Sequence, residues 1–132
     1  MKISRRTLLV GGAGVAALPC LAGEVLAEGL AKSEMPKEGV ILTALMKAKP
    51  GQEEAVQTVL LGLVEPTRKE SGCLCYNLHR SKSDQTQFLF YEQWASQAAL
   101  DAHGKSPHMK ALGGKLKGKT EKSEIVFYQL LK

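Results

Sequence analysis

Residues 90–94 read FYEQW, and residues 99–103, which follow after a short break, read ALDAH. Alternate residues of a strand share a face, so a strand over the first stretch places Glu92 and Trp94 side by side. A short helix over the second stretch folds back over that face and carries His103 on its inner side. The two stretches therefore predict a strand and a helix that bring an acid, an indole and an imidazole together in an apolar pocket.

The remaining strands are predicted from apolar runs. A nearly continuous apolar run predicts a first strand that is buried on both faces, and shorter β-rich runs predict the others. The four predicted strands cover residues 40–46, 74–79, 88–94 and 125–130.

Three helices are predicted between these strands. An apolar stripe that follows Glu53 predicts the first, which Pro66 ends or kinks. Two short helices are predicted at 96–104 and 106–114, each with a serine cap at its start and glycine at its end. The order βαββαβ is the split βαβ, or ferredoxin-like, arrangement of the α+β class, with an antiparallel sheet.

Both faces of the predicted sheet carry large apolar residues. In the third strand Phe88, Phe90 and Trp94 point to one face, while Leu89 and Tyr91 point to the other. Helices cover only one face, so the second face requires another layer. We expect a homodimer that packs sheet on sheet, because a second copy supplies that layer.

The first 27 residues have the features of an export signal. The pair Arg5-Arg6 precedes a weakly apolar segment that ends in small residues, which is typical of a twin-arginine signal peptide cleaved before Glu28. An uncleaved membrane anchor is disfavoured, because the apolar run is interrupted and falls short of the ~20 residues that a span needs. A lipoprotein cut before Cys20 is the other alternative. We expect a periplasmic or otherwise exported protein that meets the membrane only during export.

The mature chain is expected to be a flexible leader followed by one domain. Residues 28–39 are polar and form the leader, and residues 40–132 form the domain. The whole chain carries 18 Lys and Arg against 13 Asp and Glu. This mild positive charge lacks the clustered basic face that nucleic acid requires. The lysines at 115–122 lie among glycines and are interpreted as a solvated loop rather than a phosphate-binding tail.

Two cysteines remain after the predicted signal. Cys73 and Cys75 lie at i and i+2 of a predicted strand, where side chains point the same way without approaching closely enough for a bridge. We interpret them as two small buried hydrophobic residues. A redox-active C-x-C pair is the alternative, which an oxidising compartment keeps open.

Three motifs lie along the predicted domain: PG at 50–51, ESGCLCY at 70–76 and the stretch at 90–108 described above. Together they resemble the antibiotic biosynthesis monooxygenase family, and the resemblance extends from Val40 to Leu131. It implies a dimeric α/β barrel. Since the family includes small quinol monooxygenases, it also implies an enzyme that oxidises a quinol or polyphenol with dioxygen and without a cofactor.

Roles for the candidate residues follow from this resemblance and from their convergence. His103 is the candidate base that removes a phenolic proton, and Glu92 is the group that orients it. Trp94, Tyr76 and Phe90 shape the cavity. Each residue has a structural alternative. His103 could be a hydrogen-bonded core histidine, and Glu92 could pair with a backbone amide or a lysine. The aromatic residues could serve only as packing anchors.

His108 lies at the start of a predicted helix, where the helix dipole disfavours a positive charge. It is either a neutral hydrogen-bonding group in the pocket or a surface residue. The histidines lack the H-x-x-x-H and H-E-x-x-H spacings of metal sites, so we predict no metal. No glycine-rich phosphate loop follows a strand, so we predict no nucleotide cofactor.

Two other classes of function stay open. The first is an exported, non-enzymatic dimer that binds a hydrophobic small molecule in the same pocket and does not turn it over. The second is a redox protein that works through Cys73 and Cys75.

Overall fold

The computed structural model describes residues 35–131. The predicted signal peptide, its cleavage before Glu28 and the first part of the predicted leader lie outside the described residues and stay predictions. Among the described residues, no helix is both long enough and apolar enough to span a bilayer.

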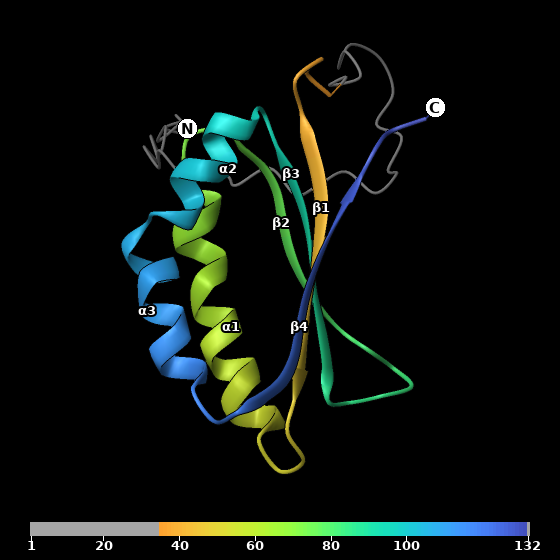
Figure 1. Ribbon diagram of the computed structural model, residues 1–132, viewed down its shortest axis with the longest axis vertical. Coiled ribbons are helices and arrows are strands. Elements are labelled where there is room, and N and C mark those ends of the chain that lie inside the picture. Colours follow the sequence, from red (N-terminus) through yellow and green to blue (C-terminus); the bar gives the residue numbers. More distant parts are fainter. Residues whose placement is uncertain (1–34, 132) are drawn as a thin grey trace, which may run out of the picture.

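The described chain folds into one antiparallel sheet with helices packed on it (Figure 1). In chain order the elements are β1 (Val40–Ala48), α1 (Glu53–Arg68), β2 (Cys73–Arg80), β3 (Gln87–Trp94), α2 (Gln97–Gly104), α3 (Pro107–Leu116) and β4 (Thr120–Tyr128). The strands lie in the order β2-β3-β1-β4, with β4 at one edge. The predicted ferredoxin-like α+β fold is confirmed.

Two helices continue past the residues expected to end them. α1 continues past Pro66 to Arg68, so of the two predicted effects of this proline the helix end is wrong and the kink stays a prediction. α3 continues through Gly113 and Gly114 to Leu116. Leu116 is buried one turn after the buried Leu112, so packing extends the helix past two residues of low helix propensity.

The predicted lysine-rich loop is also wrong in extent. Lys115 belongs to α3, and Lys122 belongs to β4, which begins at Thr120 rather than at residue 125. The turn between them is short and contains Gly118, whose φ of 76° places it in the left-handed region that glycine favours. Pairing with β1 recruits these polar residues into the strand.

All three helices lie on the same side of the sheet (Figure 1), but they cover only part of it. α1 packs on β2, α2 packs on β3, and α3 packs on α1. Most of the apolar core therefore lies between α1 and the half of the sheet that β2 and β3 form. The largest fully buried apolar side chains are Trp94, Tyr76, Phe88, Phe90, Leu60 and Val56.

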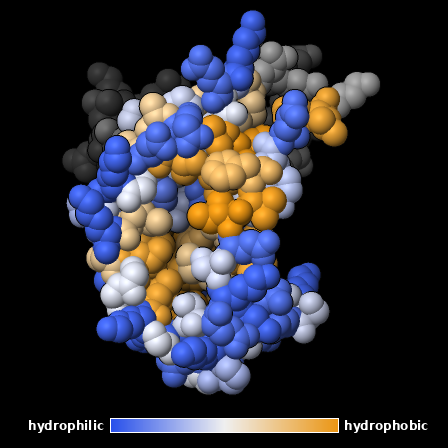
Figure 2. Space-filling view, in the orientation of Figure 1, coloured by the Kyte–Doolittle hydropathy of each residue, from blue (hydrophilic) through white to orange (hydrophobic). Residues whose placement is uncertain are grey.

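The half of the sheet formed by β1 and β4 is less well covered. Ile125 pairs with Ala44, and Phe127 pairs with Leu42, so these β4 side chains point to the helix side of the sheet. They are nevertheless 60% and 58% exposed. Figure 2 shows hydrophobic side chains gathered on this face of the molecule, in the region where β4 runs in Figure 1.

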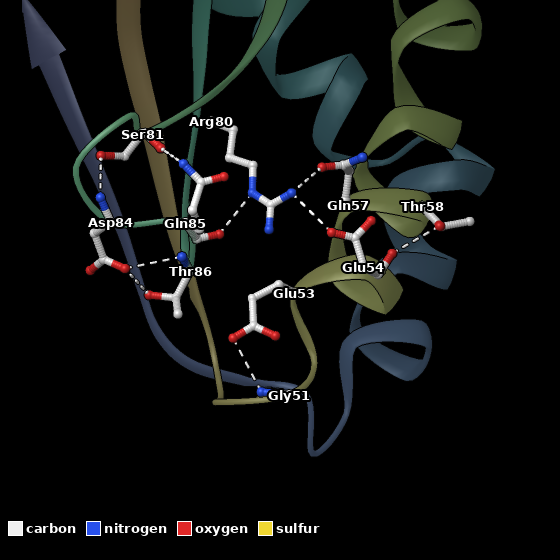
Figure 3. Close-up of polar contacts among 10 residues, drawn as sticks. All are labelled: Gly51, Glu53, Glu54, Gln57, Thr58, Arg80, Ser81, Asp84, Gln85 and Thr86. Carbon is white, nitrogen blue, oxygen red and sulfur yellow. Dashed lines mark hydrogen bonds and ion pairs between the residues drawn. The ribbon is translucent and has the colours of Figure 1, made fainter.

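Arg80 ties the far end of the sheet to α1 (Figure 3). Its Nε donates to the carbonyl oxygen of Gln85 at 2.8 Å, inside the β2–β3 hairpin. Its Nη1 donates to Glu54 at 3.0 Å and to Gln57 at 2.9 Å, both on α1. The guanidinium also lies 5.3 Å from the centre of the Phe88 ring. These contacts hold α1 over β2 and β3.

A close approach at Gly72 fixes the opposite end. Gly72 has a φ of 82°, and its carbonyl oxygen accepts a hydrogen bond from the Ala95 amide at 2.8 Å. A Cβ at Gly72 would lie 2.6 Å from the Cβ of Ala99 on α2. Only glycine satisfies both the backbone conformation and this contact, so the turn before β2 lies directly against α2.

We predict that Gly72→Ala destabilises the protein more than Gly51→Ala does. Gly51 has the same φ of 82°, but a Cβ there would meet nothing within 4 Å. The control therefore introduces only the strain of an L-residue in the left-handed region, about 1–2 kcal/mol, while Gly72→Ala adds an overlap of about 1–3 kcal/mol. Denaturant unfolding of both variants measures the difference. Equal losses would show that α2 does not depend on the close approach.

Candidate functional site

A cavity lies where the helices leave the β1–β4 half of the sheet uncovered. Its volume is about 450 Å³, within the range of small-molecule pockets. Apolar walls come from β1, β4, α1, α2 and α3, and the lining includes Leu42, Ala44, Ile125, Phe127, Leu63, Leu100 and Met109. Most of the lining is apolar, with polar groups concentrated near one end of β3 and on α2.

The cavity collects most of the residues that the sequence singled out. Tyr76, Phe90, Glu92 and His103 all line it. Trp94 is fully buried beside them, and its ring centre lies 4.7 Å from that of His103. The His108 ring centre lies 5.8 Å from that of His103. Strand β3 and helix α2 therefore bring the acid, the indole and the imidazole together as the sequence predicts.

Glu92 does not have the partner that the sequence analysis assigns to it. Its side chain is buried, and its Oε2 accepts a hydrogen bond from Trp94 Nε1 at 2.9 Å. Trp94 lies two residues after Glu92 on the same face of β3. The carboxylate beside His103 Nδ1 belongs to another residue, Glu70. Burial raises the pKa of the Glu92 carboxyl, although the hydrogen bond from Trp94 partly opposes this shift. The prediction that Glu92 orients His103 is wrong as to the partner.

Glu70 is the carboxylate that lies beside His103. Its Oε2 lies 2.8 Å from His103 Nδ1. A carboxylate only accepts hydrogen bonds, so the neutral imidazole carries its proton on Nδ1 and has its lone pair on Nε2. Burial lowers the pKa of His103, and the nearby Glu70 opposes the shift only in part. His103 is therefore a neutral imidazole with a free basic nitrogen at neutral pH.

His108 completes a cluster around the same carboxylate. Its Nε2 lies 2.7 Å from Glu70 Oε1, off the direction of a good hydrogen bond, and is within 3.2 Å of the Thr67 and Ser106 hydroxyl oxygens. The Glu70 oxygen is buried and has no better partner among the described residues. His108 is half-buried and hydrogen-bonded but does not line the cavity, so its predicted contact with a substrate stays a prediction.

The ligand atoms of Glu70, His103 and His108 lie within 4.8 Å of one another. Two imidazoles and one carboxylate are a set that divalent transition metals accept. His103 Nδ1 is hydrogen-bonded to Glu70 Oε2 at 2.8 Å, whereas His108 Nε2 approaches Glu70 Oε1 at 2.7 Å without hydrogen-bond geometry. Sequence spacing could not reveal this set, since the residues come from three separate segments. The predicted absence of a metal stays a prediction.

Tyr76 forms the floor of the cavity beside His103. Its ring stacks on Phe90 with a centre-to-centre distance of 4.5 Å, and its centre lies 5.6 Å from that of His103. Burial raises the pKa of the Tyr76 hydroxyl, so the group stays a neutral phenol. Tyr76 therefore supplies shape and an uncharged hydroxyl rather than a base.

The cysteines do not form a bridge with each other, as the strand geometry predicts. Cys73 carries a free thiol, and Cys75 is buried. Burial and the Glu70 carboxylate raise the pKa of the Cys73 thiol to about 11. The thiolate is the reactive form, so the raised pKa disfavours a redox role for this residue.

We predict that Glu92→Gln stabilises the protein at alkaline pH. A raised pKa means that the native state holds the Glu92 proton more tightly than the unfolded chain, so the free energy of unfolding falls as pH rises above the ordinary carboxyl value of 4.5. Glutamine keeps the acceptor for Trp94 and removes the buried charge. We expect a gain of about 1 kcal/mol at pH ~8 and almost none at pH ~4.

Thermal or denaturant unfolding across this pH range measures the effect, and the exposed Glu65→Gln serves as the control. His103 contributes the opposite dependence, but it is common to both proteins and cancels in the difference. A variant that is less stable than the parent at alkaline pH would show that the Glu92 charge is stabilised in the fold.

Comparisons with known proteins agree with the fold. The model of the family described as antibiotic biosynthesis monooxygenase matches residues 39–113. The protein sll1783 of Synechocystis is 31% identical over 83 residues, which are 63% of this chain and 54% of that protein. The chain therefore spans about half the length of that relative.

Two further relatives are similar over more of their own length. The protein named "Putative monooxygenase Rv0793" of Mycobacterium tuberculosis is 35% identical over 69 residues, which are 52% of this chain and 67% of that protein. The crystal structure of PA3566 from Pseudomonas aeruginosa superposes with a TM-score of 0.70 at 32% identity, covering 73% of this chain and 97% of that one. Because the family model matches more than half of its residues, the chain belongs to the antibiotic biosynthesis monooxygenase family.

Proposed function

We propose that the protein is a cofactor-independent monooxygenase that oxidises a quinol or a polyphenol with dioxygen. The observation that carries the proposal is His103, a neutral imidazole held by Glu70 and exposed to an apolar cavity. Membership of the family and similarity to a protein named as a monooxygenase support the reaction class. The binding module that the sequence left open uses the same cavity, but nothing in the comparisons favours it.

The proposed chemistry begins with a proton. His103 Nε2 accepts it from a phenolic hydroxyl, and the resulting anion donates an electron to dioxygen far more readily than the phenol does. One oxygen atom enters the ring, and the other leaves as water. The quinol supplies all four electrons for the reduction of dioxygen, so the balance requires no external reductant.

The surroundings of His103 favour this step. Glu70 accepts a hydrogen bond from the Nδ1–H group and stabilises the imidazolium that forms, as a carboxylate does beside a catalytic histidine. Glu92 and Tyr76 line the same cavity, and burial favours their neutral forms. Burial therefore opposes a negative charge on Glu92 and Tyr76, two acidic groups that would contact an aromatic ring in this cavity.

We predict that the described domain consumes oxygen in the presence of a hydroquinone or polyphenol and that His103→Ala reduces the rate by ~10²–10⁴-fold. Because the pKa of His103 is lowered, uptake by the parent protein should persist below pH ~6.5. Oxygen-electrode measurements over a panel of hydroquinones test this. The assignment is falsified if the folded variant retains full turnover.

Glu70→Gln is the companion variant for the positioning role. It keeps the size of the side chain but removes the carboxylate, so the imidazole loses its fixed tautomer and the rate falls by more than about tenfold. Glu70 opposes the lowering of the His103 pKa, so the acid limb of the pH profile moves to lower pH in the variant. A purely structural role would leave that limb in place. Uptake should also survive a chelator, and uptake that a metal restores after chelation would assign the cluster to a metal.

We also propose that the protein works as a homodimer. β4 exposes apolar side chains on the sheet face opposite the helices, where Val126 is 37% and Tyr128 is 53% exposed. Ile125 and Phe127 extend the exposed apolar surface of this edge strand to the other face. An apolar edge strand of this kind marks a surface for association, and a second copy is the partner that the sequence predicts.

We predict that Val126→Asp converts the dimer to a monomer. The substitution places a charge in the centre of the exposed apolar strand, where its desolvation opposes association. Sedimentation velocity measures the change, and Glu124→Gln, on the same face of β4, is the control that should stay dimeric. A parent protein that sediments as a monomer would contradict the proposal.

A further inference from the structure

A second cavity continues the first along α3. It has a volume of about 340 Å³ and shares four lining residues with the first cavity: Met46, Met109, Leu112 and Ser123. Beyond them it is lined by Gly113, Leu116, Lys117, Gly118 and Thr120. The two cavities therefore lie end to end, and two flexible methionine side chains stand where they meet.

The two cavities together form a groove, and α3 on one side and β1 on the other set its direction and length. On α3, Met109, Leu112, Gly113 and Leu116 follow the spacing i, i+3, i+4 and i+7, so they form one stripe along the helix. Seven residues of helix span about 10 Å. On β1, Leu42 lies level with Glu92 while Met46 lies level with Ser123, so the strand runs from the polar end of the first cavity to the second.

The two parts of the groove differ in chemistry. The first contains His103, Glu92 and Tyr76. The second has methionine and leucine side chains from β1 and α3, with Thr120 and Ser123 of β4 on its other side and Lys117 where it meets the surface. Glycine at position 113 leaves open space beside the helix at this cavity, because a Cβ there would meet nothing within 4 Å. A flat ring suits the first part, and a narrow apolar chain suits the second.

We propose that the substrate is a hydroquinone with an unbranched or isoprenoid apolar tail. The ring occupies the first cavity with a hydroxyl at His103, and the tail extends for about 10 Å between α3 and the β1–β4 half of the sheet. The inference rests on the proposed function and names the substrate class of that site. Each methylene group that leaves water strengthens binding about fourfold, so a tail contributes most of the affinity.

The test compares ligands that differ only in the tail. The probes are a methyl-substituted benzoquinone without a tail and the same quinone with a butyl or an octyl tail. Trp94 is the only tryptophan of the chain, and it lies beside His103, so quenching of its fluorescence reports binding without turnover. Oxygen uptake with the corresponding hydroquinones is measured in parallel.

Two helix glycines of α3 provide matched variants. Gly113→Leu places a side chain in the second cavity, whereas Gly114→Leu adds the same side chain at a neighbour that lines neither cavity. A Cβ meets nothing within 4 Å at either position, and leucine is a better helix former than glycine, so both variants should fold.

We expect the dissociation constant to fall about fourfold per methylene group in the parent and in Gly114→Leu until the groove is filled. Gly113→Leu should lose this dependence and keep the parent's affinity for the quinone without a tail. Tail-independent binding in the parent, or equal tail dependence in the two variants, would overturn the tail site and leave the proposed function intact. Tail-dependent binding without any oxygen uptake would overturn the oxygenase and leave the tail site intact.

Discussion

The three helices are held over one half of the sheet, and most other features of the molecule depend on that placement. Arg80 holds α1 over β2 and β3 at one end, and the close approach of Gly72 to Ala99 holds α2 at the other. The aromatic core fills the covered half. The uncovered half, formed by β1 and β4, provides the wall of the cavity and the exposed apolar edge.

Burial then sets the charge state of the site. The same desolvation lowers the pKa of His103 and raises the pKa of Glu92 and Tyr76, so each shift favours a neutral form. An apolar cavity that contains a neutral imidazole suits an aromatic substrate whose reaction begins with the loss of one proton. The hydrogen bond that His103 Nδ1–H donates to Glu70 keeps the base in one tautomer, which burial alone would not do.

The fold alone does not determine this chemistry, because sheets of the ferredoxin-like type support many unrelated functions. What distinguishes the chain is the position of its polar groups. The buried titratable groups Glu92 and His103 lie at one end of the groove, while the methionine and leucine side chains at the opposite end lie beside Thr120 and Lys117. The proposed substrate matches this arrangement, with its ring beside Glu92 and His103 and its tail beside the methionine and leucine side chains.

Hydrophobic periodicity by itself determined the elements and their order, because the spacing of apolar residues is set locally by helix and strand geometry. The local sequence around Glu92, Trp94 and His103 also brought these residues to one site, since a strand face and the helix that follows it are neighbours in the chain. Helix ends were less predictable. Gly113 and Gly114 stay helical because Leu116 is buried against the rest of the fold, and this stabilisation is absent from local propensity.

Only the tertiary structure decided the partner of His103. Glu92 is close to it in sequence, but strand geometry places its carboxylate on Trp94 Nε1. Glu70 is 33 residues away and reaches His103 because the turn at Gly72 lies against α2. Contacts of this kind depend on how separate elements pack, so the sequence contains the residues but does not show which of them pair. The strands and helices, in contrast, follow from local patterns of apolar residues along the chain.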